Sequence, residues 1–326
     1  MLRRICLLMG VLVASSAWAQ DPSRDDAAYP ARHLRLIAPF TGGSTLDIMA
    51  RVIAEQLTGA LGQNVVVDNR PGANGIIGID LVAKAPADGY TMLMTTGSFT
   101  GNMVLNKKLP YDGVRDFAPI TQIARSYGMV LLVNTAVPAK SIKELVALAK
   151  SRPGKLSYGS SGVGNITHLV AEMFKTEAGI DIVHVPYKGS APAMTDVVGQ
   201  QIDMTFLSTV SVQPYIKADR VRALALTGSE RSPVLPDLPT FKELGLPGVE
   251  MTGWYGLWFP AKTAQARVNR IQSAIKKAVA SPELKARLAE FGLVSVASSP
   301  AEFARFLRED FALQARIVKQ AGIVPQ

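Results

Sequence analysis

The organisation of this chain follows from one stretch, Leu34-Arg35-Leu36-Ile37-Ala38-Pro39-Phe40-Thr41-Gly42-Gly43-Ser44-Thr45-Leu46-Asp47. An apolar run of strand length leads into a Gly-Gly turn, and a Ser-Thr-x-Asp pattern then begins a helix. Ser44 can cap that helix, and Asp47 can return a hydrogen bond to the turn. We therefore expect a strand, a glycine turn and a helix start in immediate succession.

This succession is suited to binding an anion. Glycines allow several backbone N–H groups to converge without obstruction by Cβ atoms. The N–H groups in the first turn of a helix have no partner within the helix, so a carboxylate or phosphate can accept their hydrogen bonds. We predict that this loop forms one side of a ligand site, made by Thr41, Gly42, Gly43, Ser44 and Thr45.

The chain contains two units of the order βαβαβ. In the first unit we expect strands at 34–39, 64–68 and 90–95 and helices at 45–60 and 76–84. In the second we expect strands at 156–158, 182–186 and 202–207 and helices at 166–177 and 191–199. Each unit has a glycine loop after its first strand, and Gly42 and Gly162 lie 120 positions apart. Such units form parallel-rich sheets that bind ligands beyond the carboxyl ends of their strands, so the two loops can face each other across a cleft.

The rest of the chain completes two domains. Further strands are expected at 129–133, 221–227 and 254–259. Helices are expected after the capping box Ser141-Ile142-Lys143-Glu144 and at 263–280, 282–291 and 300–321. A stripe on the last helix, Phe303, Leu307 and Phe311, indicates core packing. We predict an α/β fold of two domains, each a parallel-rich sheet flanked by helices, joined by crossover segments near 126–130 and 248–254 that form a hinge. The first domain would hold residues 29–127 and 251–326, and the second residues 128–250.

The N-terminus has the pattern of a secretory signal peptide. Leu2-Arg3-Arg4 is a positive region, residues 5–14 are mostly apolar, and Ala17-Trp18-Ala19 fits the small-x-small cleavage rule. The apolar run is about 10 residues long, against the roughly 20 that a spanning helix needs. We expect cleavage near Ala19, with residues 1–19 removed, and an exported mature protein.

Composition excludes several chemistries. Cys6 is the one cysteine and lies in the signal segment, so the mature protein would have no disulfide and no thiolate nucleophile. The net charge is +9, or +7 without Arg3 and Arg4, and the basic residues are scattered, with no interleaved aromatic ladder, so no nucleic-acid partner is indicated. The histidines, His33, His168 and His184, have no metal-ligand spacing, so we expect no metal and no cofactor.

Enzymatic and nucleotide-binding motifs fail in detail. The loop Gly159 to Asn165 lacks the Lys-Ser/Thr of a P-loop, and Thr167 stands where a dinucleotide fingerprint needs Gly or Ala. No Gly-x-Ser-x-Gly elbow occurs, so no catalytic residue is assigned. An exported α/β hydrolase or esterase that uses a loop serine remains the alternative function.

Three residues near the loops have open roles. His168 either braces the second loop through a hydrogen bond or contacts a bound anion. Lys188 either faces the anion or is solvated. The pair Trp254-Tyr255, flanked by glycines, either packs the hinge between the domains or covers the cleft.

Ordered blocks of residues resemble a known family, the Bug-type extracytoplasmic receptors of tripartite tricarboxylate transporters. The resemblance spans essentially the whole mature chain. It rests on Tyr29-Pro30, 39–51, 67–75, Asp88-Gly89-Tyr90-Thr91, 158–168, 184–193 and Leu238-Pro239-Thr240-Phe241. It implies a two-domain fold like that of a type II periplasmic binding protein. It also implies a monomeric periplasmic receptor that closes by hinge motion on a small organic carboxylate and delivers it to one large and one small membrane permease subunit.

The resemblance also implies which residues bind. In the family the two glycine loops hold the carboxylate, here Thr41 to Thr45 and Ser160 to Asn165. With the neighbouring residues, the predicted ligand-binding set is Thr41, Gly42, Gly43, Ser44, Thr45, Ser98, Ser160, Gly162, Val163, Gly164, Asn165, His168, Lys188, Phe206 and Leu207.

Two departures from the family pattern bear on the ligand. The second loop carries Asn165 where Ser or Thr is more usual, and the strand that ends near Phe206 continues with Leu207 rather than an acidic or small polar residue. An apolar Leu207 would leave an ammonium group without a partner, which predicts a carboxylate without an α-amino group. A sensory binding protein of a two-component system would share the fold and differ only in its partner.

Overall fold

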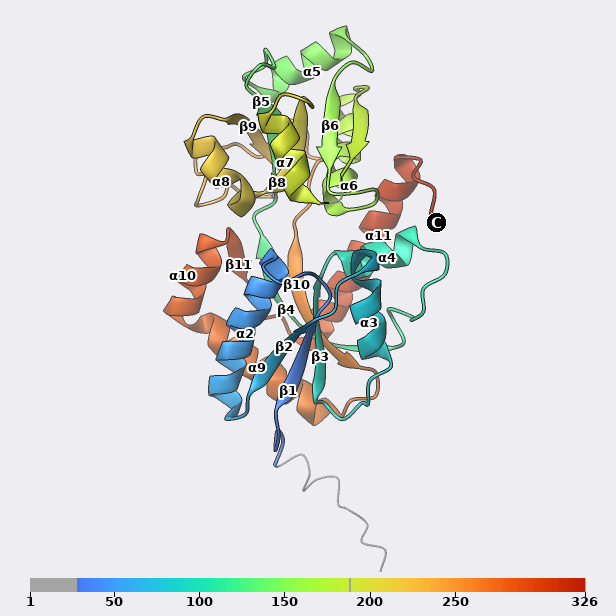
Figure 1. The fold of residues 1–326 in the computed structure, drawn as a ribbon, viewed down its shortest axis with the longest axis vertical. Coiled ribbons are helices and arrows are strands. Elements are labelled where there is room, and N and C mark those ends of the chain that lie inside the picture. Colours follow the sequence, from blue (N-terminus) through green and yellow to red (C-terminus); the bar gives the residue numbers. More distant parts are fainter. Residues whose placement is uncertain (1–27, 188, 326) are drawn as a thin grey trace, which may run out of the picture.

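The computed structural model describes residues 28–187 and 189–325, and they form two sheets, one in each half of an elongated molecule (Figure 1). The predicted signal peptide, its cleavage site and Lys188 lie outside the described residues. The first sheet has the strand order β11-β4-β10-β3-β1-β2. Its strands are β1 (Leu34–Ala38), β2 (Val65–Asn69), β3 (Thr91–Thr96), β4 (Phe117–Ser126), β10 (Trp254–Pro260) and β11 (Leu293–Ser295).

The second sheet has the order β7-β6-β8-β5-β9. Its strands are β5 (Met129–Asn134), β6 (Ser157–Ser160), β7 (Val183–Pro186), β8 (Met204–Ser208) and β9 (Val221–Leu226). In both sheets, three strands of one βαβαβ unit are parallel, β2-β1-β3 and β7-β6-β8. The predicted repeat and the predicted α/β fold are confirmed.

Both sheets are mixed rather than wholly parallel. β10 runs antiparallel to β3 and β4, and β5 runs antiparallel to β8 and β9. The chain passes from the first sheet to the second between β4 and β5 and returns between β9 and β10. A strand that arrives from the other half enters its sheet from the opposite end, so it pairs antiparallel with the neighbouring strand of the unit.

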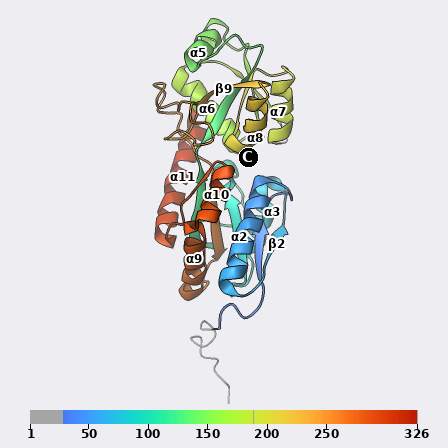
Figure 2. The same ribbon diagram turned by 90° about the vertical axis from the view of Figure 1, so that its left-hand side faces the viewer.

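Helices cover the faces of both sheets, and the C-terminal helices return to the first sheet as predicted (Figures 1 and 2). α9 packs on α2, whereas α11 contacts α4 and β4 of the first half and also α6 of the second. The helices are α2 (Thr45–Leu61), α3 (Ile76–Ala83), α4 (Ser98–Leu105), α5 (Ile142–Ser151), α6 (Ile166–Ala178), α7 (Ser190–Val198), α8 (Thr209–Lys217), α9 (Gln265–Ala280), α10 (Pro282–Glu290) and α11 (Pro300–Gln320), with a 3-10 turn at Ala73–Gly75.

Four elements were not predicted from the sequence, namely β4, β11, α4 and α8. β4 contains Pro119 and polar residues, α4 contains Gly101 and Asn102, and α8 contains Pro214. These residues weaken local propensity, so the conformation is decided by packing with distant segments. β4, for example, lies between β10 and β11, both of which come from the C-terminal third of the chain.

The predicted stripe on α11 is core at one end only. Phe303 is fully buried and makes ring contacts with Trp254 and Trp258, and Leu307 packs against the same cluster. Phe311 is 37% exposed, so its assignment to the core was wrong. At 3.6 residues per turn, a step of eight residues rotates the side chain by about 80° around the helix, which carries Phe311 off the packed face.

Alanine substitutions of Phe303 and Phe311 should differ in their effect on the free energy of unfolding, because only Phe303 is part of the core. Phe303→Ala removes a fully buried ring and should lower the free energy of unfolding by about 3–5 kcal/mol. Phe311→Ala, on the same helix, is the matched control and should change it by less than about 1 kcal/mol. Urea denaturation followed by circular dichroism measures both. Equal losses in the two variants would contradict the packing described for α11.

Candidate functional site

The first glycine loop links β1 to α2 as the sequence predicts. Ser44 is the N-cap of α2, and its Oγ accepts a hydrogen bond from the Asp47 N–H at 3.2 Å. Asp47 Oδ2 accepts in return from the Gly43 N–H at 2.9 Å. Burial raises the pKa of Asp47, but the hydrogen bonds from Gly43, Arg51 and Asn69 outweigh it, so the pKa lies below its ordinary value. The loop is therefore fastened by an ionised carboxylate.

The second glycine loop has the same construction between β6 and α6. Asn165 is the N-cap of α6, and its Oδ1 accepts from the Thr167 N–H at 3.2 Å. Gly162 and Gly164 have φ values of 132° and 75°, in the region that favours glycine. A Cβ atom at Gly164 would lie 2.3 Å from Leu105 Cδ1 of α4, so this loop closely approaches the first half of the molecule.

His168 braces the second loop. Its Nδ1 accepts a hydrogen bond from the Gly164 N–H at 3.0 Å, and its ring stacks on His184 with the centroids 4.0 Å apart. Burial lowers the pKa of His168 to about 4, with His184 adding to the effect. A neutral imidazole can accept at Nδ1, whereas a protonated one cannot. Of the two roles open from the sequence, the hydrogen bond to the loop is present.

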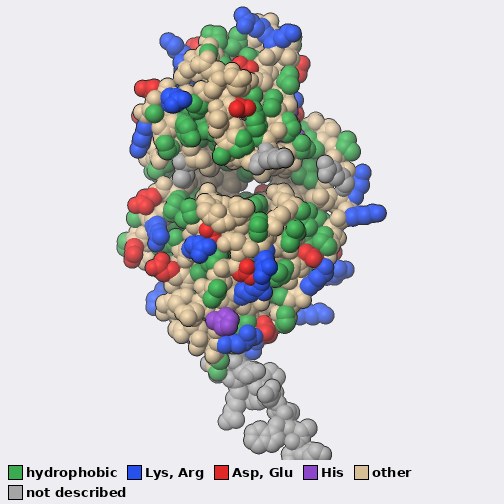
Figure 3. All heavy atoms as spheres, viewed as in Figure 1, with side chains coloured by type: hydrophobic (Ala, Val, Ile, Leu, Met, Phe, Trp, Pro, Cys, Tyr) green, Lys and Arg blue, Asp and Glu red, His purple; other side chains and the backbone are tan. Residues whose placement is uncertain are grey.

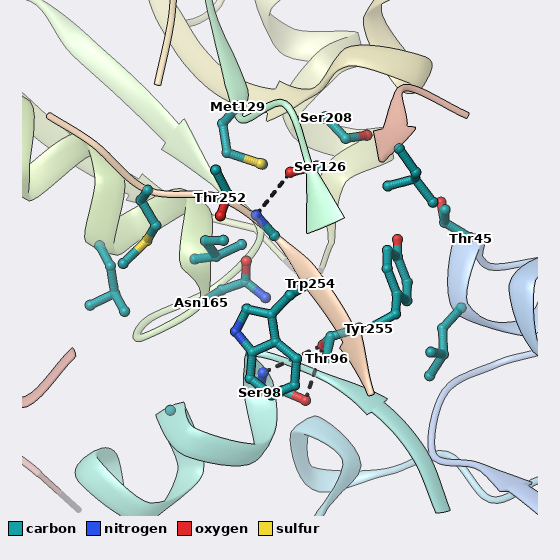
Figure 4. A pocket seen from close by; sticks show the side chains of 18 of the residues that line it. Thr45, Thr96, Ser98, Ser126, Met129, Asn165, Ser208, Thr252, Trp254 and Tyr255 are labelled. Atoms are coloured by element: carbon teal, nitrogen blue, oxygen red, sulfur yellow. Dashed lines mark hydrogen bonds between the residues drawn. The ribbon is translucent and has the colours of Figure 1, made fainter. Parts of the chain in front are cut away.

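A cavity of about 280 Å³ lies between the two halves, and four helices begin at its wall. α2 and α4 begin in the first half, and α6 and α8 in the second, each directly after a strand of a parallel unit. Polar side chains at these helix starts are Ser44, Thr45, Ser98, Asn165, Ser208 and Thr209. Figure 4 labels four of them, Thr45, Ser98, Asn165 and Ser208. Since the first turn of each helix has N–H groups without helical partners, donors from both sheets converge on one space.

The structure brings together five of the predicted site residues at this cavity: Ser44, Thr45, Ser98, Gly164 and Asn165. Several others belong to the loops but do not line the cavity, namely Thr41, Gly42, Gly43, Ser160, Gly162 and Val163. Ser160 is completely buried, and its Oγ lies 2.6 Å from His184 Nε2. His168 also lies behind the loop rather than at the cavity wall.

Phe206 and Leu207 are core residues, which corrects their expected position at the ligand. Phe206 contacts the rings of Phe174 and Phe241 on one face of the second sheet, and Leu207 packs in the cluster on the other face. Successive side chains of a strand point to opposite faces, so neither points beyond the end of β8, where the cavity lies. The prediction that the bound carboxylate has no α-amino group rested on Leu207 at the ligand, and the position of Leu207 in the core does not support it.

Other residues of the cavity were missed from the sequence. The polar ones are Asn74, Thr96, Ser126, Ser208, Thr209, Thr252, Asp310 and Gln314. Thr209 is 2% exposed, and its Oγ1 has no hydrogen-bond partner among the described residues. Ser208 is the last residue of β8 and Thr209 follows it, so the strand-end rule that located the two glycine loops could have found them. Asp310 lies far along the chain on α11, and no local pattern points to it.

Asp310 is an acidic group in the cavity wall. Its Oδ2 accepts hydrogen bonds from Thr100 Oγ1 at 2.5 Å and from Gln314 Nε2 at 2.7 Å. Burial raises the pKa of Asp310 above its ordinary value, and hydrogen bonds from Thr100, Gln314 and Trp254 oppose that rise. Among the described residues, no Lys, Arg or His lines the cavity.

The sequence left two roles open for Trp254 and Tyr255, namely packing at the hinge or covering the cleft, and the two side chains are placed differently in the structure. Trp254 is 1% exposed and packs edge-to-face against Phe303 and Phe306, which anchors the returning segment to α11. Both residues line the cavity, and Tyr255 is only partly buried there (Figure 4). Burial raises the pKa of Tyr255 to about 12, so the hydroxyl is protonated near neutral pH.

The described part of the chain contains neither a metal-ligand cluster nor a helix suited to span a membrane. Within it, no group of three or more His, Cys, Asp and Glu side chains could hold a metal ion. No helix in residues 28–187 and 189–325 is both long and apolar enough to cross a membrane. Lys and Arg side chains are scattered over the outer surface, and a hollow is visible between the halves (Figure 3).

The buried state of His168 predicts a pH effect on stability. The pKa is 6.5 for an ordinary histidine and about 4 in the fold, so in this interval the unfolded chain binds a proton that the folded chain does not. The free energy of unfolding should therefore fall as the pH is lowered from 6.5 to 4. His168→Gln, which keeps an acceptor for Gly164, should reduce that loss in urea denaturations at pH 7 and 4.5. Exposed His33→Gln is the control and should leave it unchanged.

Known proteins share both the sequence and the fold. Residues 49–323 match the protein family described as "Tripartite tricarboxylate transporter family receptor". The chain is 37% identical over 305 residues to the UPF0065 protein in the tcbD-tcbE intergenic region of Pseudomonas sp. (strain P51), covering 93% of this chain and 90% of that protein. The structure of R. palustris Rpa4515 with adipate has a TM-score of 0.83 and 36% identity, covering 91% of this chain and 100% of the other.

A second solved structure carries the Bug name that the resemblance predicts. The periplasmic binding protein BugD has a TM-score of 0.79 and 32% identity to this chain, covering 91% of this chain and 100% of that protein. The family match begins within α2 and includes all of α6 and of the C-terminal helix α11, which bears Asp310. This chain therefore belongs to the Bug-type receptors of the tripartite tricarboxylate transporter family.

Proposed function

We propose that this protein is a non-enzymatic periplasmic receptor that binds a small organic carboxylate in the cavity between its two halves. It would deliver the ligand, as a monomer, to one large and one small permease subunit. The observation that supports this proposal most directly is that four helix N-termini converge on one cavity. Supporting it, the family is one of transport receptors, and Rpa4515, a member of similar structure, is described with adipate.

Neutral donors are sufficient to bind the carboxylate. The N-terminus of a helix carries about half a positive charge, and its free N–H groups point along the axis toward a ligand. In this cavity the hydroxyl groups of Thr45, Ser98 and Ser208 stand beside such N–H groups. Donors from α2 and α4 and donors from α6 and α8 meet only when the two halves are close, so a bound anion would favour the closed state.

The hinge would lie where the chain crosses between the sheets, at Tyr127-Gly128 and near Thr252-Gly253. These positions correspond to domains of residues 29–127 with 251–326 and of residues 128–250, with residues 1–19 removed as the signal peptide near Ala19. Gly128 has φ 125°, and a Cβ atom there would lie 2.4 Å from the Gly228 nitrogen. The crossing therefore requires glycine at position 128.

The hydrolase alternative has one observation in its favour. Ser160 Oγ and His184 Nε2 are 2.6 Å apart, the contact expected of a nucleophile and its base. Ser160 is nevertheless completely buried and does not line the cavity, so a substrate could not reach its Oγ in this structure. A sensory role would use the same cavity and a different membrane partner.

A ligand screen tests the receptor function. In thermal-shift measurements, at least one acid from a panel of mono-, di- and tricarboxylates should raise the melting temperature, because a ligand bound only by the folded state stabilises it by mass action. p-Nitrophenyl esters, offered in parallel, should be hydrolysed no faster than in buffer. Ester turnover without any stabilisation by carboxylates would replace the receptor with the hydrolase.

A matched pair of threonines tests the helix-start site. Thr45→Val removes a hydroxyl at the cavity wall and should weaken carboxylate binding about tenfold, as expected for one hydrogen bond to a charged group. Thr41→Val, in the same loop but away from the wall, should leave the dissociation constant within about twofold. Isothermal titration calorimetry gives both values. Equal effects would place the ligand on the outer part of the loop.

A further inference from the structure

We infer that this receptor selects an apolar monocarboxylate, an acid with one carboxylate and a hydrocarbon body, over a dicarboxylate of the same length. The inference rests on the proposed function and names its ligand class. Three observations carry it: the composition of the cavity wall, the charge of Asp310, and the absence of a described cationic side chain to pair with a second carboxylate.

Part of the cavity lining is apolar. It is formed by Met129 and Met251 on the crossing segments, Ile166 and Leu169 in the first turn of α6, and Trp254 and Phe291. Met129 points into the cavity near the start of β5 (Figure 4). Methionine and aromatic side chains adapt to hydrocarbon, and a polar ligand group placed against them would lose its hydration without gaining a partner.

The charge distribution allows one carboxylate. The helix starts provide partial positive charge for it, whereas Asp310 is negative when ionised and lies beside the start of α4, where Gln314 also contacts the N-cap Gly97. The Oδ2 of Asp310 is already used by Thr100 and Gln314, so it is held in place rather than free to turn away. A second carboxylate near this wall would meet a like charge, and no Lys, Arg or His of the described residues lines the cavity to offset it.

Calorimetric titrations with two series of acids test this preference. Wild-type protein is first freed of bound ligand by denaturation and refolding. It is then titrated at pH 7.5 with the monocarboxylates butanoate, pentanoate and hexanoate and with the dicarboxylates succinate, glutarate and adipate. Each added methylene of the monocarboxylates should strengthen binding about three- to fourfold until the cavity is filled. Hexanoate should bind at least about tenfold more tightly than adipate. Phenylacetate, with an aromatic body, should bind more tightly than butanoate.

Two variants test which residues cause the preference for an apolar monocarboxylate. Met129→Gln should weaken hexanoate several-fold and leave butanoate nearly unchanged, whereas Met173→Gln, partly buried in the second half but away from the cavity, is the matched control. Asp310→Asn keeps an acceptor for Thr100. It should reduce the ratio of the adipate dissociation constant to the hexanoate dissociation constant about tenfold. Hexanoate binding and the melting temperature of Asp310→Asn show that it is folded.

The outcomes separate this inference from the proposed function. If wild-type protein binds adipate as tightly as hexanoate, or if affinity does not rise with chain length, the apolar monocarboxylate is excluded while the receptor stands. If the ratio of the adipate and hexanoate dissociation constants is unchanged in folded Asp310→Asn, the charge of Asp310 does not cause the preference for a monocarboxylate. If none of the acids binds and no other carboxylate raises the melting temperature, the receptor function itself fails.

Discussion

The two segments that cross between the sheets are fastened to each other, and the rest of the structure depends on this fastening. Ser126 Oγ accepts hydrogen bonds from the Gly253 N–H at 2.9 Å and from the Gly128 N–H at 3.2 Å. Thr227 Oγ1 donates to the Met251 carbonyl at 2.6 Å and accepts from the Met129 N–H at 2.8 Å. One buried hydroxyl at each end of the crossing thus pins both segments. This makes the ends of the two sheets face each other.

That arrangement turns ordinary helix starts into a binding site. Each parallel unit ends its strands at the same edge and begins its helices there, which follows from βαβ connectivity. The crossing brings these edges together, so unpaired N–H groups from α2, α4, α6 and α8 are directed at one cavity. Such donors are rigid and uncharged, so they lose little freedom on binding and favour an anion without requiring an ion pair.

Other residues of the cavity lie far from the glycine loops in sequence. Met129, Met251 and Trp254 come from the crossing segments, and Asp310 comes from α11, which contacts both halves. In the proposed receptor the helix starts would hold the carboxylate, and these segments would surround the rest of the ligand. Selectivity would then depend on elements far from the loops in sequence.

The sequence alone determined the repeated unit, its glycine loops and the caps of their helices, because these depend on residues a few positions apart. Ser44 with Asp47 and Asn165 with Thr167 are local contacts, and they formed as the residue types require. It also predicted that five loop and helix-start residues would meet, since parallel strands end at one edge. The strands β4 and β11 could not be predicted, because their conformation comes from pairing with segments more than a hundred residues away.

Only the tertiary structure decided which side chains line the cavity. Leu207 is apolar and close to a strand end, yet the pleat of β8 directs it into the core. Phe311 continues a helical stripe, yet the rotation of α11 carries it to the surface. Asp310 has no local signature, and it reaches the cavity because α11 packs along α4, where Thr100 donates to it. Local contacts are specified by neighbouring residues, whereas orientation toward a cavity depends on how distant elements pack.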